Sequence, residues 1–259
     1  MRALILAAGR GSRLHPYTDT VPKCLTEIAG ITLIERQITT LRACGIKDIV
    51  IVTGYLADHL NIPDTRQIYN PRWMETNMVE SLFCAVEEFT DDLIVSYSDI
   101  VYERRVLEAL LRSQSNISVA VDKNWRAYWE FRFADPLSDA ESLRLDVEGR
   151  ITDIGLPVDD IDGVEAQYMG LMRFRGDGVD ILMRTKQELG FRRRAWMDER
   201  PIEKAYMTDL LMEMVLTGVD VHAVPIAGGW LEIDTVKDYR DIAKLYESGD
   251  ISRFYDAQA

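Results

Sequence analysis

The chain has 259 residues, of which 47% are hydrophobic and 28% charged, and 43 acidic against 30 basic side chains give a formal net charge of −13. This composition can bury a sizeable core, which excludes a disordered or fibrous protein. The acidic excess argues against a nucleic-acid-binding role, because such proteins gain affinity from Lys and Arg that replace counterions on phosphates. The one dense basic run, Arg192 to Arg194, is typical of a solvated surface.

Cysteine use and hydropathy indicate the cellular compartment. The three cysteines cannot all pair, none forms a C-x-x-C motif, and only three histidines accompany them, so neither a disulfide framework nor a zinc site is predicted. The apolar run at 3–7 is too short for a signal-peptide core, and no run reaches transmembrane length. We therefore expect a cytoplasmic protein without membrane insertion, and the sequence leaves open whether it is a monomer or a dimer.

The first elements form a β-α-β unit. A short buried strand over 3–7 leads into a glycine-containing turn and a polar loop. A helix follows Gly30, and Gly45 is expected to end it before a strand over 48–53. Apolar residues recur in this helix at three- and four-residue steps: Leu33, Ile34, Ile38 and Leu41.

The alternation continues with a helix over 78–89, a strand over 93–97, a helix over 105–112 and a strand over 117–121. Strands that alternate with helices are typical of a parallel, right-handed, doubly wound sheet. We therefore predict an α/β fold on a doubly wound, mostly parallel sheet, with residues 1–259 forming a single domain.

Residues 123–166 interrupt this alternation. Aromatic side chains gather there, and apolar runs at 143–147 and 151–154 flank Glu148-Gly149-Arg150, which predicts a small inserted antiparallel hairpin. The sheet is then expected to resume, with a strand over 167–174, helices over 177–189 and 201–216, and a last strand over 230–233.

The last strand is expected to end at an acidic side chain. Thr235 and Asp238 stand three residues apart, as in the capping box that begins a helix. This spacing places Asp234 at the carboxyl end of the strand before it.

The strongest feature is the glycine loop directly after the first strand. Glycines there let backbone N–H groups approach an anion, and Arg13 and Lys23 can counter the charge of a triphosphate. A dinucleotide fingerprint would require glycine in place of Leu14, and no G-x-x-x-x-G-K-[ST] occurs. A plain glycine turn would explain Gly9-x-Gly11 alone, but the spacing of Arg13, Pro22 and Lys23 favours a phosphate site.

The segment L-A-A-G-R-G-S-R-L at 6–14, extended by Pro16, Thr18, Pro22 and Lys23, resembles the signature of the nucleotidyltransferases that join a nucleoside triphosphate to a sugar phosphate or small alcohol phosphate. The resemblance implies a Rossmann-like nucleotidyltransferase fold, in which Arg13 and Lys23 are catalytic cations that contact phosphates. It assigns the nucleotide to Leu6, Ala7, Ala8, Gly9, Gly11, Ser12 and Arg13.

Two acidic residues follow predicted strands. Asp99 comes after the strand over 93–97, and Asp234 ends the strand over 230–233. Carboxylates at strand ends can converge on Mg²⁺, which prefers a few carboxylate oxygens with phosphates and water. The family resemblance likewise implies that this pair holds the metal, although many relatives show D-x-D where Tyr97 replaces the first Asp. A structural role in a turn would explain either carboxylate alone.

The segment from Thr76 to Leu82 predicts a helix start whose N–H groups and polar side chains could face a base, with simple capping as the alternative. Asn77 and Ser81, together with W-L-E-I-D at 230–234, resemble the phosphocholine cytidylyltransferases. That resemblance implies CTP, with Asn77, Ser81 and Ser98 near the nucleotide.

Further stretches are similar to cytidylyltransferases for phosphoglutamine in capsule synthesis, which extends the resemblance over nearly the whole chain and implies a role in capsule or surface polysaccharide biosynthesis. These stretches are 98–102, 121–125, 132–137 and 165–168.

The aromatic residues Trp125, Tyr128, Trp129, Trp196 and Trp230 are candidates for the acceptor pocket, to which the insert would contribute. Ring faces attract ammonium groups when water is excluded, although packing of the insert is a competing explanation. Asp122 and Glu165 are candidates to pair with an amine. The acceptor contacts expected are Lys23, Lys123, Trp125, Glu165, Gln167 and Trp230.

These features predict a CTP-dependent cytidylyltransferase that uses Mg²⁺. An acceptor phosphate or phosphonate oxygen would attack the α-phosphorus in line and expel pyrophosphate. A phosphate monoester has a second pKa of about 6, so no general base is needed. Phosphocholine, phosphoethanolamine, phosphoglutamine and 2-aminoethylphosphonate stay open as acceptors.

Two alternatives remain at this point. One is a sugar-1-phosphate nucleotidyltransferase that uses UTP, dTTP or GTP. The other is a catalytically inactive nucleotide-binding protein, for which Tyr97 in place of an acidic residue is the best argument.

Overall fold

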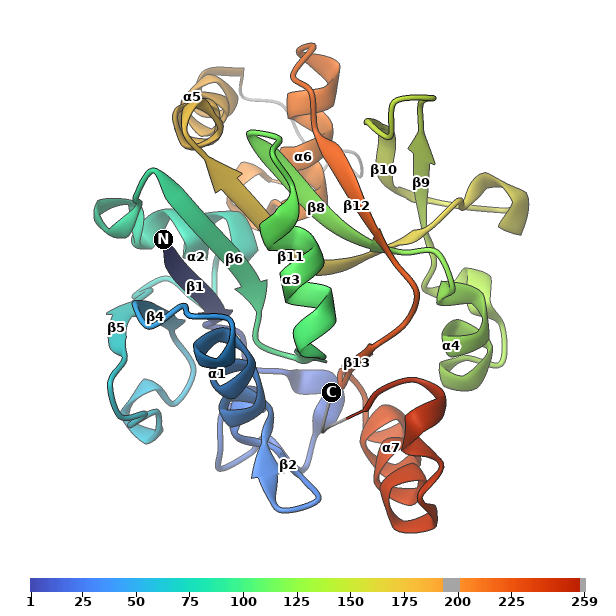
Figure 1. The fold of residues 1–259 in the computed structure, drawn as a ribbon. Coiled ribbons are helices and arrows are strands. Elements are labelled where there is room, and N and C mark those ends of the chain that lie inside the picture. The colour runs from blue at the N-terminus through green and yellow to red at the C-terminus, as the bar shows by residue number, and fades with distance from the viewer. Residues whose placement is uncertain (193–200, 257–259) are drawn as a thin grey trace.

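The computed structural model describes residues 1–192 and 201–256, so Arg193, Arg194 and Trp196 lie outside the described residues. Within the described part, a central seven-stranded sheet has the order β12-β8-β11-β6-β1-β4-β5 (Figure 1). Its strands are β1 (Arg2–Ala7), β4 (Ile49–Thr53), β5 (Arg66–Tyr69), β6 (Asp92–Tyr97), β8 (Ile117–Asp122), β11 (Gln167–Arg175) and β12 (His222–Ile226).

Both faces of the sheet are covered, as the near-continuous apolar strands predict. Alternate residues of β1 enter two separate cores, Ala3 and Ile5 on one face, Leu4 and Leu6 on the other. The first core includes residues of α1 (Leu33–Ala43), α3 (Arg104–Arg112) and α7 (Val236–Ser248). The second includes residues of α2 (Met78–Cys84), α5 (Asp177–Arg192) and α6 (Met207–Leu216). The predicted doubly wound, mostly parallel α/β fold is confirmed.

One strand breaks the expected parallel order. β11 runs antiparallel to both β6 and β8, and Gln167 at its start pairs with Asp122 at the end of β8. The insert therefore leaves and re-enters the sheet at the same edge. A strand that starts at the carboxyl edge must run back toward the other edge, which explains its direction.

The ends of the sheet also differ from the prediction. β5 and β12 were not predicted, because both are short edge strands with mixed polarity, and β12 contains Pro225, which edge strands tolerate. The predicted last strand, β13 (Trp230–Glu232), does not join the central sheet. It pairs antiparallel with β7 (Ile100–Tyr102), which directly follows β6.

The predicted helices differ from the structure mainly at their ends. α2 ends at Cys84 and is followed by a 3-10 turn over Val86–Glu88, so the helix expected over 78–89 is shorter. α6 begins only at Met207, after a 3-10 turn that follows Pro201. The expected capping box of α7 is present, since the Thr235 and Asp238 side chains each accept from the backbone N–H of the other.

The inserted region contains the expected hairpin, formed by β9 (Glu141–Leu145) and β10 (Ile151–Pro157), and an additional helix, α4 (Trp125–Arg132). Figure 1 shows α4 beside the loop that leads to β13 and α7. A further small hairpin, β2 (Glu27–Ile28) and β3 (Ile31–Thr32), precedes α1. None of the helices in the described ranges is long and apolar enough to cross a membrane.

Candidate active site

A cavity of about 240 Å³ lies at the carboxyl ends of β1 and β6, where open α/β sheets bind ligands. We call it the first cavity. It brings together every residue that the sequence assigned to nucleotide, metal and catalysis, from five separate segments. Its lining is Leu6, Ala7, Ala8, Gly9, Gly11, Ser12, Arg13, Lys23, Cys24, Trp73, Thr76, Asn77, Met78, Ser81, Tyr97, Ser98, Asp99 and Asp234.

The glycine loop closes tightly against Lys23. Gly11 has φ of 65°, and a Cβ there would lie 2.9 Å from the Cβ of Lys23, so only glycine fits without displacement. The Thr18 hydroxyl donates to the Gly11 carbonyl at 3.0 Å. Leu14, at the position where a dinucleotide loop would have glycine, is fully buried and anchors the loop in the core.

Two cations and two carboxylates form the charged end of the cavity. The Lys23 ammonium lies 2.7 Å from an Asp99 oxygen and 2.6 Å from an Asp234 oxygen. The Arg13 guanidinium reaches the other Asp234 oxygen at 2.6 Å. Burial disfavours the charged form of Lys23, but the two carboxylates outweigh it and raise the pKa of Lys23. Lys23 therefore stays protonated at the bottom of the cavity.

Of the four oxygens of this carboxylate pair, Lys23 and Arg13 contact three. Asp99 Oδ1 is buried and has no hydrogen-bond partner among the described residues. Residues 1–192 and 201–256 contain no cluster of three or more His, Cys, Asp or Glu side chains placed to hold a metal. Asp99 and Asp234 thus fit a hard divalent cation whose remaining ligands are phosphate oxygens and water.

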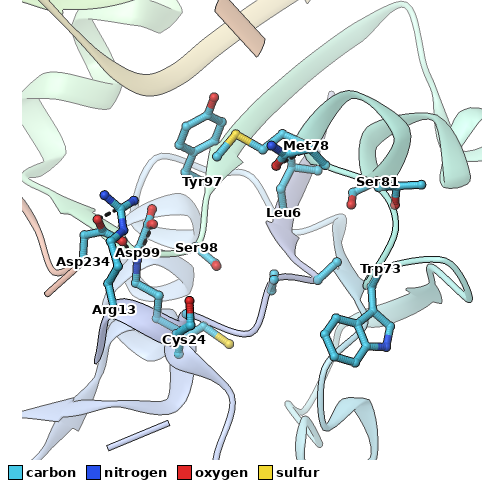
Figure 2. Close-up of a pocket in the computed structure, with 18 residues that line it drawn as sticks. Leu6, Arg13, Cys24, Trp73, Met78, Ser81, Tyr97, Ser98, Asp99 and Asp234 are labelled. Atoms are coloured by element: carbon cyan, nitrogen blue, oxygen red, sulfur yellow. Dashed lines mark hydrogen bonds and ion pairs between the residues drawn. The ribbon is translucent and has the colours of Figure 1, made fainter. Parts of the chain in front are cut away.

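The opposite end of the first cavity is polar and aromatic (Figure 2). Buried Asn70 donates from its amide to the hydroxyls of Thr76 and Ser81, at 3.0 and 3.1 Å. Trp73 lines this end, and a Cβ at Gly54 would collide with the Trp73 side chain at 2.6 Å. Trp73 was not predicted to lie at the site. Thr76 was named as the first residue of the segment that could face a base, without an individual role.

A second cavity of about 250 Å³ adjoins the first and shares Arg13, Met78, Tyr97 and Asp234 with it. The remaining lining is Ile100, Trp129, Asp139, Glu141, Gln167, Tyr168, Met169, Gly170, Tyr206, Thr208, Trp230 and Glu232. Tyr97, the residue in place of a first Asp, has its ring against Gly170, where a Cβ would lie 2.5 Å from the ring. It packs edge-on against Tyr168.

The second cavity is rich in negative charge. Burial, with Asp99, Asp234 and Asp139 nearby, raises the pKa of Glu232 to about 7, although Arg132 opposes the shift. Burial also raises the pKa of Asp139, and repulsion from Asp234 adds to this. Carboxylates forced together in this way are stabilised by any cation that enters between them.

Only some of the residues that the sequence assigned to the acceptor line a cavity. Gln167 and Trp230 line the second cavity, and Lys23 lines the first. Lys123, Trp125 and Glu165 line neither.

The three residues outside the cavities have local partners. Lys123 lies 3.8 Å from Glu165 at the surface, and Trp125 is buried against Trp129. Asp122, an expected amine partner, accepts instead from the Trp230 indole N–H at 2.9 Å and the Gly228 N–H at 2.9 Å. Trp129, one of the aromatic candidates for the acceptor pocket, does line the second cavity. Asp139, Glu141 and Glu232 were not predicted, and of these only Glu232 lies in a quoted motif.

The fold and the first cavity define a nucleotidyltransferase, and comparison with known proteins agrees. Residues 3–154 match the MobA-like NTP transferase domain. The chain is 37% identical to the CTP:phosphoglutamine cytidylyltransferase of Campylobacter jejuni over 249 residues, which cover 92% of this chain and 97% of that protein. This protein belongs to the family of MobA-like NTP transferases.

Two further relatives show how far the similarity extends. The choline-phosphate cytidylyltransferase of Streptococcus pneumoniae is 33% identical over 117 residues, 44% of this chain and 51% of that protein. A solved structure of CTP:phosphocholine cytidylyltransferase from the same organism matches with a TM-score of 0.70 over 95% of this chain and 98% of that chain. At 21% identity, this structural match supports the fold alone.

Proposed function

We propose that the protein is a CTP-dependent cytidylyltransferase that joins CMP to a small phosphate or phosphonate bearing an amine, and releases pyrophosphate. The observation that carries the proposal is the junction of the two cavities, where Arg13 and Asp234 line both. A nucleotide in the first cavity and an acceptor in the second would meet there. The similarity to the phosphoglutamine enzyme over nearly the whole chain supports CTP as the donor.

The first cavity fits a nucleoside triphosphate lengthwise. The base belongs at the end formed by Trp73, Thr76 and Ser81, where ring stacking and hydroxyl groups are available. The triphosphate belongs along the glycine loop, with its charge next to Arg13 and Lys23. This placement gives Asn77 and Ser98 positions along the nucleotide between the two ends.

The second cavity fits the amine of the acceptor. An ammonium group between Asp139 and Glu232 would relieve their mutual repulsion. The rings of Trp129 and Tyr168 offer faces that attract the same charge. The insert thus supplies part of the acceptor pocket through Trp129, Asp139 and Glu141, whereas Lys123, Trp125 and Glu165 take no part in it.

Transfer requires positioning and neutralisation of charge. The acceptor oxygen attacks the α-phosphorus in line and the bond to pyrophosphate breaks, so the phosphorus exchanges one oxygen for another. Arg13 and Lys23 neutralise charge on the leaving pyrophosphate and the reacting phosphates. Mg²⁺ held by Asp99 and Asp234 would add positive charge at the phosphates when bound. We place the reaction in the cytoplasm, in agreement with the free thiols of Cys24, Cys44 and Cys84.

A pyrophosphate-release assay tests the proposal. It crosses the four ribonucleoside triphosphates and dTTP with phosphocholine, phosphoethanolamine, phosphoglutamine, 2-aminoethylphosphonate and glucose-1-phosphate, all with Mg²⁺. We expect release with CTP and an amine-bearing acceptor. Release with glucose-1-phosphate alone would contradict the proposal in favour of a sugar-phosphate enzyme. CTP binding without release from any acceptor would favour a nucleotide-binding protein.

A further inference from the structure

Arg132, the last residue of α4, is a buried cation that lines neither cavity. Its side chain is 1% exposed, and its guanidinium carbon lies 5.5, 5.3 and 4.8 Å from the ring centres of Tyr128, Trp129 and Phe133. Arginine is almost never buried unless it is paired. Here it pairs with two carboxylates, one on each side of Asp234 in the sequence.

The first partner is Asp238 in the first turn of α7. The guanidinium donates to both carboxylate oxygens of Asp238, at 3.0 and 3.3 Å. Asp238 Oδ2 in turn accepts the backbone N–H of Asp234 at 3.2 Å and of Thr235 at 2.8 Å. Arg132 therefore fixes the carboxylate that holds the backbone of Asp234 in place.

The second partner is Glu232, which lines the second cavity. Arg132 Nη1 donates to the Glu232 carboxylate. One turn earlier on α4, the Tyr128 hydroxyl accepts from the backbone N–H of Glu232 at 2.9 Å and lies 3.2 Å from its carbonyl oxygen. α4 thus holds Glu232 by both its side chain and its backbone.

We propose that Arg132 is a positioning residue that sets Asp234 for the nucleotide and Glu232 for the acceptor from a single guanidinium. A planar guanidinium can bind both oxygens of Asp238 and one of Glu232 through different nitrogens, a fixed geometry that the single nitrogen of a lysine cannot reproduce. This inference rests on the proposed function. It gives the insert a second role, because the helix that borders the acceptor cavity also holds the proposed metal carboxylate.

Arg173 provides a matched control. It is also buried, at 6% exposure, and binds both oxygens of Asp92 at 2.8 Å. Asp92 begins β6, whereas Asp99 follows the carboxyl end of the same strand, so this ion pair lies at the opposite edge of the sheet from the site. If breaking any buried arginine ion pair lowers activity, substitution of Arg173 should lower it as much as substitution of Arg132.

The experiment compares Arg132→Lys and Arg132→Met with Arg173→Met. The readouts are CTP affinity without metal, Mn²⁺ retention in the presence of CTP by electron paramagnetic resonance, and steady-state kcat and acceptor KM. We expect Arg132→Met to keep CTP affinity, to bind Mn²⁺ with CTP at least about tenfold more weakly, and to lose about 100-fold in kcat/KM for the acceptor, the scale of a misplacement by about 1 Å. Arg173→Met should lose thermal stability only.

Arg132→Lys keeps the buried positive charge, so it preserves the fold if Arg132→Met does not. It should still raise acceptor KM and lower kcat, because a single ammonium nitrogen cannot reproduce the three separate guanidinium contacts to Asp238 and Glu232. Arg132→Lys with unchanged Mn²⁺ retention and kinetics would overturn the inference, as would Arg173→Met with the same losses as Arg132→Met. If the wild-type protein binds no CTP, the proposed function and this inference are both overturned. If wild type and the Arg132 variants bind CTP and Mn²⁺ equally well, this inference alone is overturned.

Discussion

At the scale of single residues, Lys23 lies between the two carboxylates that we propose as metal ligands. Its ammonium lies within 2.7 Å of both Asp99 and Asp234, and Arg13 occupies a further oxygen of Asp234. The cluster is electrically balanced without a metal, so a divalent cation must displace positive charge to enter. A triphosphate offers both side chains an alternative anion. The metal and the nucleotide are therefore expected to bind together.

This arrangement predicts the behaviour of Lys23→Met toward Mn²⁺ in the absence of nucleotide. Removal of the ammonium leaves Asp99 and Asp234 with less positive charge, so the variant should bind Mn²⁺ at least about tenfold more tightly than wild type, or ~1.4 kcal/mol. Turnover should nevertheless fall, because Lys23 is needed at the phosphates. Mn²⁺ titration followed by electron paramagnetic resonance measures the affinity. Lys123→Met is the matched control, since Lys123 lines neither cavity, and identical Mn²⁺ affinities in all three proteins would refute the prediction.

Asn70 determines how the hydroxyls at the base end are oriented. Its Oδ1 accepts the backbone N–H of Arg72 at 2.9 Å, so its amide N–H groups must point to Thr76 and Ser81. The Thr76 hydroxyl donates to the Arg72 carbonyl at 2.8 Å. The Ser81 hydroxyl accepts from Asn70, which leaves its own hydrogen to donate into the cavity. A donor there favours cytosine N3, an acceptor, over uracil N3–H.

Asn70→Ala should therefore lower kcat/KM with CTP more than kcat/KM with UTP. We expect the ratio of the two kcat/KM values to fall by about tenfold, the equivalent of one net hydrogen bond of ~1.4 kcal/mol. The measurement is pyrophosphate release with each nucleotide. Thr40→Ala serves as a control because Thr40 bonds backbone carbonyls outside both cavities. A variant whose CTP and UTP activities fall in equal proportion would show that Asn70 only supports the fold.

At the scale of elements, the start of α7 depends on the ionised form of Asp238. Burial alone would raise the pKa of Asp238, but Arg132 and the backbone and hydroxyl of Thr235 outweigh it and hold that pKa below its ordinary value. A carboxyl group with a lowered pKa in the folded state binds protons more weakly there than when unfolded. Its stabilisation is thus present above the unfolded pKa of about 3.9 and is lost as the pH falls through the folded pKa.

Asp238→Asn should consequently destabilise the protein at pH 7 by about 3–5 kcal/mol, the usual cost of breaking a buried ion pair. The difference between wild type and variant should shrink as the pH falls below about 4, because Asp238 of the unfolded wild-type chain then gains a proton that the folded chain binds only at lower pH. Urea unfolding at a series of pH values gives the difference directly. Asp241→Asn, at a more exposed position of the same helix, should show a much smaller effect. A pH-independent difference would mean that the charge of Asp238 is not what stabilises the helix.

Elements differed in how well the sequence predicts them. Buried strands such as β1 and β4 were readable because apolar runs lie between glycine and polar turns. The direction of β11 could not be predicted, because it depends on where the chain returns to the sheet after the 44-residue insert, 123–166. Within α4, aromatic content suggested Trp125 as an acceptor contact, but the helix buries that ring and turns Trp129, one turn later, toward the second cavity.

At the scale of the whole molecule, the site joins chain segments that only the fold brings together. The first cavity was largely predictable, since its glycine loop is contiguous and Asp99 follows the carboxyl end of β6. Asp234 reaches the same place by another route, because β13 pairs with β7 directly after β6. The second cavity was not predictable, because Asp139, Glu141 and Glu232 come from the insert and from β13, with no common spacing in the sequence. Whether each aromatic ring is buried in the core or faces the cavity depends on how α4 packs against β13. These two elements are far apart in the sequence, so local patterns do not predict the outcome.

Because the site joins distant segments of the chain, ligand binding should stabilise the folded state as a whole. CTP with Mg²⁺ would bridge β1, α2, β6 and the turn after β13, which are separate in the unfolded chain, so it should stabilise the folded state by about 2.7 kcal/mol at 100 times its Kd. For a chain of this size the melting temperature should rise by roughly 5–10 °C. Mg²⁺ alone should have little effect, because Lys23 and Arg13 already neutralise Asp99 and Asp234. Differential scanning calorimetry distinguishes the cases, with Asp234→Asn as the variant expected to lose the added effect of Mg²⁺. A large stabilisation by Mg²⁺ without nucleotide would show that the carboxylates are open to the metal from the start, contrary to the charge balance of the cavity.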